Sequence, residues 1–386
     1  MTNTEMFDKI ISYIREEFKK NAGFIPLHEP LFQGNEKKYI NEAIESTFVS
    51  SIGTFVDRFE DMIAEIAQSK RGVAIVNGTS ALHLALRLSG VSKETEVITQ
   101  ALTFVATPNA ISYLGAYPVF LDVDRNTMGL SPDALLAFLD EFGELRDDGT
   151  YNKKTGRKIS ACVPMHTFGF PCDIISIVNI CKKRKIPVIE DAAESLGSYY
   201  RGKHTGGFGT MGIFSLNGNK IITSGGGGAI VTNYDSLADL GKHLSTTAKK
   251  SHPWDYYHDY LGYNYRMPNI NAALACAQIE NLDYFLNKKR DLAGRYDQFF
   301  NSLGIKFRKE SKDSKANYWL MAIELENKKE RDQFLKKTNQ SMIMTRPIWT
   351  LMNKLPFYKQ CIHDDLKESL YLEDRIVNIP SSVISD

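Results

Sequence analysis

A single lysine stands between a short apolar segment and a run of glycines. The segment Gly212 to Leu216 is predicted to be a strand, Lys220 follows in a polar turn, and residues 225–228 are all glycine. Glycine has no Cβ, so such a run lets the backbone fold back tightly. A lysine amine whose pKa is lowered by burial or by nearby cations is a nucleophile that forms imines with aldehydes. A lone loop lysine is more often a surface residue, so this hypothesis depends on partners elsewhere in the chain.

A candidate anion site lies earlier in the chain. Gly78, Thr79 and Ser80 directly follow an apolar strand predicted at 73–76, and they begin a predicted helix. Backbone N–H groups, two hydroxyls and the positive end of a helix together suit a phosphate. Ser215, on the strand before the lysine, could reach the same anion. Serine and threonine also cap many ordinary helices, so this pattern is weak by itself.

A carboxylate is the third candidate group. Asp191 ends the apolar strand predicted at 187–191. A carboxylate in this position can pair with the ring nitrogen of pyridoxal phosphate (PLP) and keep it protonated, which makes the ring an electron sink. Capping of a following helix is the alternative role. An amine, a phosphate site and a carboxylate fit one cofactor, so the sequence favours PLP attached to Lys220.

The elements that must position these residues alternate in type. Helices are predicted between most members of a series of strands, which lie at 73–76, 96–99, 118–122, 160–165, 187–191 and 212–216. This alternation predicts an α/β fold with a mostly parallel sheet covered on both faces. Ligands in such sheets bind at the carboxyl ends of the strands. The polar, turn-rich segment 143–158 is expected to be an exposed excursion.

The second half of the chain has a different pattern. The alternation ends near Leu244, and residues 251–266 form an aromatic and polar segment without periodicity. A long helix, bent in places, is predicted over 269–300. We therefore expect residues 1–265 to form an N-terminal arm and a large PLP-binding domain, and residues 266–386 to form a smaller C-terminal α+β domain.

Bulk composition excludes several classes of protein. The net charge is +1, so neither a nucleic acid nor an acidic membrane is an expected partner. The five cysteines include no C-x-x-C pair, and the histidines have no metal-ligand spacing, so we expect no disulfide framework and no metal. No apolar run is long enough to cross a membrane. Glu5 and Asp8 precede any apolar run, which is unlike a signal peptide. A soluble cytoplasmic enzyme is the resulting expectation.

A glycine motif at 207–212 matches the dinucleotide fingerprint, but it precedes a predicted strand rather than a helix. A nicotinamide-dependent sugar oxidoreductase is therefore disfavoured. A DNA-binding regulator would need a basic face or a helix-turn-helix, and the balanced charge offers neither.

Three motifs in order resemble one family. Residues 188–195 (Val-Ile-Glu-Asp-Ala-Ala-Glu-Ser) resemble its aspartate motif, residues 214–220 its lysine motif, and residues 262–267 its Gly-x-Asn-x-Arg-Met motif. Three ordered motifs are specific where each alone is not. From about residue 24 to residue 380, the chain is similar to the DegT/DnrJ/EryC1/StrS sugar aminotransferases, which have PLP fold type I.

This resemblance implies cofactor roles. Lys220 would hold PLP as a Schiff base and shuttle protons, while Asp191 would pair with the pyridine nitrogen. Phe104 would stack on the ring, and Glu194 would lie near it, where relatives often carry Gln or His. Asn264 would complete the phosphate site from a neighbouring subunit, which implies a homodimer with shared active sites. The whole set of implied contacts is Gly78, Thr79, Ser80, Phe104, Asp191, Glu194, Ser215, Lys220 and Asn264.

The resemblance also implies a substrate. Segments 24–30 and 346–349 are similar to enzymes of legionaminic acid and bacillosamine biosynthesis, whose substrates are usually UDP-linked 4-keto-6-deoxy-2-acetamido sugars. We therefore expect L-glutamate to donate its amino group to C4 of such a sugar, for a nonulosonic acid or for a bacterial surface glycan such as lipopolysaccharide. The implied substrate contacts are Ser51, Gly53, Thr54, Arg346 and Trp349.

Two alternatives stay open. The family often has Gly-Glu-Gly-Gly where this chain has four glycines at 225–228, which leaves the substrate subgroup undecided. One alternative is an aminotransferase for another nucleotide keto sugar, of the GDP-perosamine or 3-amino type. The other is a PLP-dependent sugar dehydratase, in which a histidine replaces the lysine; Lys220 argues against it.

Overall fold

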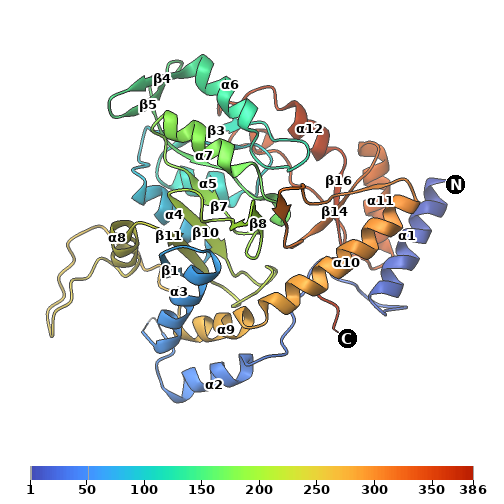
Figure 1. Cartoon of the computed structure of the whole chain (residues 1–386), viewed down its shortest axis with the longest axis horizontal. Helices are drawn as coiled ribbons and strands as arrows, with labels where there is room; N and C mark the ends of the chain where they lie inside the picture. The colour runs from blue at the N-terminus through green and yellow to red at the C-terminus, as the bar shows by residue number, and fades with distance from the viewer. Residues whose placement is uncertain (1, 51, 386) are drawn as a thin grey trace.

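The computed structural model describes residues 2–50 and 52–385 of the chain. A central sheet lies in the middle of the molecule (Figure 1). Its strands run in the order β3–β2–β6–β7–β10–β11–β1. Parallel bridges Cys162–Val188 and Met165–Asp191 join the two halves of this sheet. The strands are β1 (Arg71–Ile75), β2 (Glu96–Gln100), β3 (Tyr117–Leu121), β6 (Lys158–Val163), β7 (Ile189–Asp191), β10 (Met211–Ser215) and β11 (Gly228–Thr232).

The pairing is mostly parallel, as predicted. β2 is parallel to β3 and β6, and β10 is parallel to β7. β11 is the antiparallel exception and lies between β1 and β10. The sequence pattern did not predict β11. A side chain at Gly228 would place its Cβ 2.6 Å from the carbonyl carbon of Asn77, so the glycine run permits this insertion.

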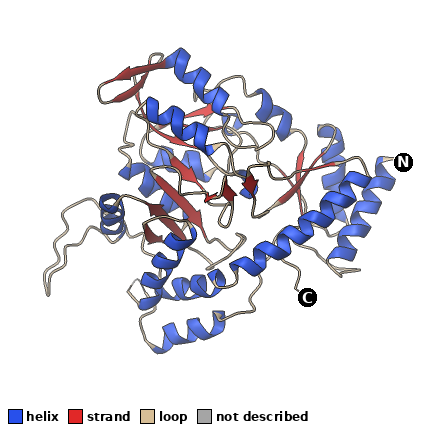
Figure 2. Cartoon of the chain, viewed as in Figure 1, coloured by secondary structure: helices blue, strands red, loops and turns tan. Residues whose placement is uncertain are grey.

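Helices cover both faces of the sheet (Figure 2). Val97 and Ile98, neighbours on β2, belong to two different cores because successive strand residues point to opposite faces. One core contains residues of α4 (Gly78–Leu88), α5 (Ala106–Tyr113) and α8 (Asp235–Ser245), and the other those of α6 (Pro132–Phe142) and α7 (Ile174–Lys183).

A smaller antiparallel sheet follows, in the order β12–β14–β16–β15. The first helix of the chain packs against the helix at 328–340, since the rings of Phe7 and Phe334 lie with centroids 5.3 Å apart. The boundary expected at residue 265 stays a prediction. The elements of this region are α1 (Asn3–Glu17), α10 (Leu282–Ser302), β12 (Lys306–Phe307), β14 (Met321–Glu324), α11 (Lys328–Gln340), β15 (Arg346–Pro347), α12 (Lys367–Glu373) and β16 (Ile376–Ile379).

The remaining elements connect these two regions. The helix expected over 269–300 is two helices, α9 (Asn269–Ile279) and α10, which meet at Glu280 and Asn281. α9 packs against α2 (Glu36–Glu45) and α3 (Thr54–Ile66). Short elements complete the described chain: η1 (Thr167–Gly169), β8 (Tyr199–Tyr200), β9 (Lys203–His204), β13 (Ser314–Lys315) and η2 (Met352–Lys354).

Segment 143–158 differs from its expectation. It is a β-hairpin, β4 (Gly143–Arg146) and β5 (Gly149–Asn152), whose second strand pairs with β6. Thr150 and Asn152 are fully buried, and the Asn152 amide donates to Glu96 at 2.8 Å. Polar side chains that hydrogen-bond to one another at the edge of a sheet have the same composition as an exposed loop. The sequence pattern could therefore not identify this hairpin.

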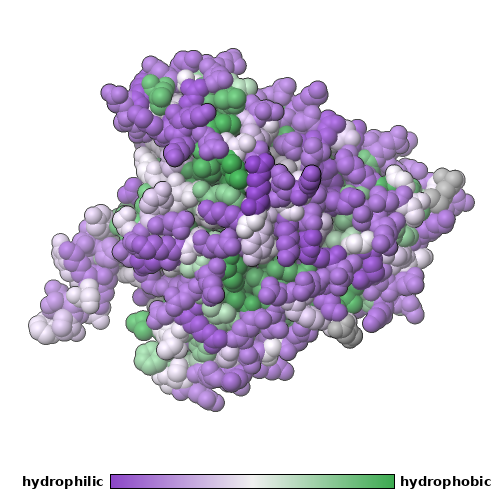
Figure 3. Space-filling view, viewed as in Figure 1, coloured by the Kyte–Doolittle hydropathy of each residue, from purple (hydrophilic) through white to green (hydrophobic). Residues whose placement is uncertain are grey.

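The loop between α8 and α9 projects from the body (Figure 1). Trp254 and Leu261 in this loop are 80% and 84% exposed. The face of the molecule seen in Figure 3 is otherwise mainly polar, with apolar side chains gathered near its middle. Among the residues that the structure describes, no helix combines the length and the apolarity needed to span a bilayer.

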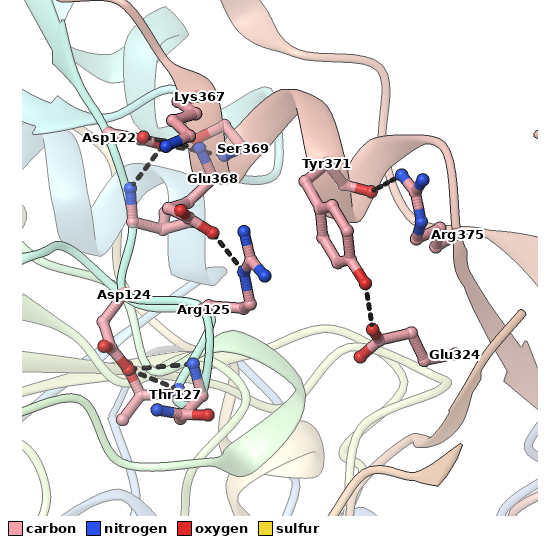
Figure 4. Close-up of polar contacts among 12 residues, drawn as sticks. Asp122, Asp124, Arg125, Thr127, Glu324, Lys367, Glu368, Ser369, Tyr371 and Arg375 are labelled. Carbon is pink, nitrogen blue, oxygen red and sulfur yellow. Dashed lines mark hydrogen bonds and ion pairs between the residues drawn. The ribbon is translucent and has the colours of Figure 1, made fainter. Parts of the chain in front are cut away.

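Hydrogen bonds from the start of α12 to Asp122 connect this helix to the end of β3 (Figure 4). Leu366, which precedes α12, has a φ of 52° and provides no side-chain cap. Instead the buried Asp122 carboxylate accepts the N–H groups of Glu368 and Ser369, each at 2.7 Å. A carboxylate at a helix N-terminus satisfies free N–H groups and interacts favourably with the helix dipole. The large sheet therefore supplies the cap that α12 lacks.

Replacement of Asp122 by alanine should destabilise the protein by about 2–3 kcal/mol, because the buried N–H groups of α12 lose their acceptor. Urea unfolding followed by circular dichroism would measure the change as a lower midpoint. Asp148→Asn, on the exposed β4–β5 hairpin, is the control and should leave the midpoint nearly unchanged. Equal midpoints for Asp122→Ala and wild type would contradict the assigned role of this carboxylate.

Candidate active site

A cavity of about 660 Å³ lies at the carboxyl ends of β7 and β10, with walls from both sheets. Its volume is within the range of ligand sites in proteins. Residues predicted separately from the sequence line it together, namely Gly78, Thr79, Phe104, Asp191, Glu194, Ser215, Lys220, Arg346 and Trp349.

Four predicted site residues that the structure describes lie outside this lining. Ser80 uses its N–H in a 2.8 Å hydrogen bond to the side chain of Asn77. Gly53 and Thr54 begin α3, where Gly53 lies against Asn269. Asn264 is exposed, next to Arg266 at the base of the projecting loop. Ser51 lies outside the described residues.

The Lys220 amine has two neighbours within the cavity. Its Nζ lies 3.2 Å from Oε1 of Glu194 and 3.9 Å from the centroid of the Trp319 ring. Only 12% of the lysine side chain is exposed. Trp319 is fixed in turn, since its indole N–H donates to the carbonyl of Asn219 at 2.5 Å. Trp319 comes from the region just before β14, and nothing in the sequence pattern linked it to Lys220.

Asp191 is a buried carboxylate with two donors. Thr107 Oγ1 donates to its Oδ2 at 2.6 Å, and the Ala193 N–H donates to its Oδ1 at 3.2 Å. Burial raises the pKa of Asp191, whereas these two hydrogen bonds and the nearby Lys220 act in the opposite direction. Thr107 lies on α5 and was missed by the sequence analysis, because the pairing joins two segments far apart in the chain.

The anion cradle is built by a close approach of two backbones. Asn77 caps α4 through its side chain, which leaves Gly78 and Thr79 in the first turn facing the cavity. A side chain at Gly78 would place its Cβ 2.9 Å from the Cβ of Ser215, so only glycine lets the serine lie this close. A helix N-terminus beside a hydroxyl is a suitable phosphate site.

Glu194 is held in place by backbone groups. Its Oε2 accepts the N–H of Phe168 at 2.9 Å, and its own carbonyl accepts the Asn317 amide at 2.8 Å. Phe168 has a φ of 57°, a left-handed conformation that a bulky residue rarely adopts. Burial raises the pKa of Glu194 to about 7. The carboxyl group is therefore able to change its ionisation near neutral pH.

The other wall of the cavity is aromatic. The Trp349 ring packs on Phe168 with centroids 4.9 Å apart and lies 6.2 Å from the half-exposed Phe104 ring. Arg346, on β15, is exposed beside them, and its guanidinium donates to Asn339 at 3.1 Å. This wall presents flat rings and one cation to the space above Lys220, a combination that suits an anionic ligand with a ring.

The dinucleotide-like motif at 207–212 has a structural role. Backbone N–H groups of Gly206, Phe208 and Gly209 donate to the carboxylate of Glu190, at 2.6–2.8 Å. Glu190 is fully buried. The glycine loop thus binds a carboxylate of the protein itself rather than a pyrophosphate.

The residues of the cavity fit PLP: an anion cradle, a buried carboxylate and a partly buried amine surround one space. The model of the DegT/DnrJ/EryC1/StrS aminotransferase family matches residues 30–384. The chain belongs to this family. It is a PLP-dependent sugar aminotransferase with PLP fold type I.

Individual relatives agree with this assignment. The chain is 39% identical to the GDP-perosamine synthase of Escherichia coli O157:H7, over 87% of this chain and 88% of the relative. The GDP-perosamine synthase of Vibrio cholerae is 36% identical, with 87% of each chain covered. A crystal structure of a DegT/DnrJ/EryC1/StrS aminotransferase from Brucella abortus superposes with a TM-score of 0.81 at 25% identity, covering 90% of each chain.

Thr107 generates a prediction for this aminotransferase. Thr107→Val should weaken PLP binding roughly tenfold, because Asp191 loses a hydrogen bond to its charged form. The loss also raises the pKa of Asp191 further, so affinity should fall at a higher pH than in the wild type as the solution is acidified.

Fluorescence titration of the apoenzyme with PLP at several pH values would measure both effects. Thr107→Ser keeps the donor and serves as the matched control. If the valine variant binds PLP like the serine variant at every pH, the hydrogen bond to Asp191 has no role in cofactor affinity.

Proposed function

We propose that this enzyme transfers the amino group of L-glutamate to C4 of a nucleotide-linked 4-keto-6-deoxy sugar. When bound, PLP supplies an aldehyde carbon that accepts the amino group and a ring that withdraws electrons. The observation that carries the proposal is the convergence of Lys220, Asp191 and the α4 cradle on one cavity. Glutamate leaves as 2-oxoglutarate, and the keto sugar leaves as an amino sugar, so the two halves balance.

The chain's own groups divide the work. Thr79 and Ser215 would hold the phosphate of the cofactor, with Ser80 completing the turn, and Asp191 would keep the ring nitrogen protonated. Phe104 would stack on the ring. The amine of Lys220 would take a proton from the substrate carbon and return it later, which is general base and general acid catalysis by one group.

The nucleotide and the sugar have two candidates. Similarity of segments 24–30 and 346–349 to enzymes of legionaminic acid and bacillosamine biosynthesis favours a UDP-linked 2-acetamido sugar. Relatives named GDP-perosamine synthase favour a GDP-linked sugar. Arg346 would bind the diphosphate of either one, and Trp349 would contact a ring of the substrate. In either case the product would enter a surface glycan or a nonulosonic acid.

A homodimer is part of the proposal. The loop between α8 and α9 carries exposed aromatic side chains and projects away from the body, and Asn264 lies at its base. In a second copy of the chain, this Asn264 would reach the cofactor phosphate. Ser51, Gly53 and Thr54, which do not line the cavity described above, would then contact the sugar nucleotide at the shared site.

Lys220→Ala should abolish covalent attachment of PLP and reduce transamination by at least about a thousandfold, because nucleophile and proton carrier are both lost. Purified wild-type enzyme should absorb visible light, and borohydride followed by peptide mass spectrometry should place the cofactor on Lys220. Lys309→Ala, in the exposed Lys309–Asp297 ion pair outside the cavity lining, is the control. A wild-type protein that stays colourless with added PLP would contradict the proposal.

A substrate panel would separate the two sugars. UDP-linked and GDP-linked 4-keto-6-deoxy sugars would be incubated with L-glutamate, and amino sugars detected by mass spectrometry. We expect the UDP-linked 2-acetamido sugar to be aminated with the higher kcat/KM. A reversed preference would assign the GDP-linked substrate, and amination of neither would overturn C4 transfer to such sugars.

Subunit mixing would test the shared site. Lys220→Ala and Asn264→Ala should each be inactive alone, whereas refolded mixtures should recover roughly a quarter of the wild-type activity, because half of the dimers contain one intact site. Mixtures that stay as inactive as the separate variants would place Asn264 outside the partner's active site.

A further inference from the structure

The neighbours of the Lys220 amine form a preformed site for a cation. Nζ lies between a carboxylate oxygen of Glu194, at 3.2 Å, and the face of the Trp319 ring, at 3.9 Å from its centroid. A carboxylate attracts an ammonium ion, and an aromatic face attracts any cation placed over it. Both contacts are therefore of a kind that attracts an ammonium group.

Both partners are also fixed by hydrogen bonds that do not involve the lysine. The second oxygen of Glu194 is fixed by the Phe168 N–H, and the Glu194 main chain is fixed by Asn317. Trp319 is 4% exposed, and its main-chain N–H also donates to Asn317, at 2.8 Å. Asn317 thus orders both walls of the cation site at once.

Catalysis by this enzyme requires the lysine nitrogen to exist in two situations. It is bonded to the cofactor in one part of the cycle, and it is a free amine that carries the substrate proton in the other. On taking that proton from the substrate carbon, the amine becomes an ammonium ion that is largely shielded from water. A buried charge without a partner is costly in free energy, so this ion needs groups nearby that stabilise its charge.

We propose that Glu194 and Trp319 are positioning residues that hold the Lys220 ammonium ion while its nitrogen is not bonded to the cofactor. The pair thereby stabilises the amine form of the enzyme relative to the aldehyde form. This inference rests on the proposed aminotransferase function. It names two residues that would set the equilibrium between the two half-reactions. It acts through Lys220 and requires no contact with the sugar.

The holding site is also sensitive to pH. Burial raises the pKa of Glu194 most, and the nearby Asp191 raises it further, whereas Lys220 and the Phe168 N–H lower it. With a pKa raised to about 7, the carboxylate is present above pH 7 and is lost as the pH falls through that value. The stabilisation should follow the same course.

An equilibrium measurement tests the proposal without turnover of sugar. The holoenzyme is mixed with L-glutamate and 2-oxoglutarate at fixed ratios, and the visible absorbance reports how much cofactor carries the amino group. Glu194→Gln should need a glutamate ratio that is roughly ten- to a hundredfold higher for half conversion at pH 8, because a charge-assisted hydrogen bond is lost. Below pH 7 the variant and the wild type should converge.

A second variant keeps the test open if the first does not fold. Trp319→Phe should shift the midpoint in the same direction by a few fold, because phenylalanine attracts cations less strongly than tryptophan does. Glu144→Gln, on the exposed β4 strand, is the matched control and should show the wild-type midpoint. A further readout is steady-state kinetics, in which Glu194→Gln should lower kcat more than it changes KM for the sugar.

The possible outcomes distinguish failure of the holding site from failure of the proposed function. If Glu194→Gln and Glu144→Gln have the same midpoint at pH 8, the holding site is overturned. If Glu194→Gln is insoluble, a wild-type midpoint in Trp319→Phe overturns it instead. A wild-type enzyme whose absorbance does not respond to glutamate overturns the proposed function, and the holding site with it.

Discussion

The parallel pairing of β7 with β10 is the constraint on which the site depends. Ile213 lies beside Asp191 in this pairing, so the strand that ends in the carboxylate and the strand that leads to the lysine finish at the same edge. β11 then returns antiparallel along β10 and pairs with β1, which places Gly228 beside both Ile75 and Ser215. One register therefore brings the carboxylate, the amine and the α4 cradle around a single space.

Much of this could be predicted from the sequence, because residues at strand ends have a fixed consequence in a parallel sheet. The positions of strand ends and helix starts predicted three neighbours for Lys220. All three, Thr79, Asp191 and Ser215, line the cavity. Their roles toward the cofactor and the substrate remain predictions. Thr107 and Trp319 could not be found in this way, since a helix residue and a residue from the second sheet carry no pattern that links them to a strand end.

One wrong prediction and one correctly rejected motif have a common physical origin. Segment 143–158 was expected to be an exposed loop because it is polar, yet Asn152 pairs with Glu96 inside the sheet edge. The motif at 207–212 looks like a phosphate-binding loop because its N–H groups are free of side-chain obstruction, yet they bind Glu190. Composition reports that polar groups need partners, and only the fold decides whether those partners are water, a ligand or the protein.

The packing of α1 against α11 has a consequence for biosynthesis. Ile10 and Ile14 on α1 are completely buried, and the Phe7 ring rests on Phe334. During translation the first helix leaves the ribosome long before its partner has been made. Its apolar stripe therefore stays uncovered on the nascent polypeptide until α10 and α11 have been synthesised, so a chaperone would have to shield this segment in the meantime.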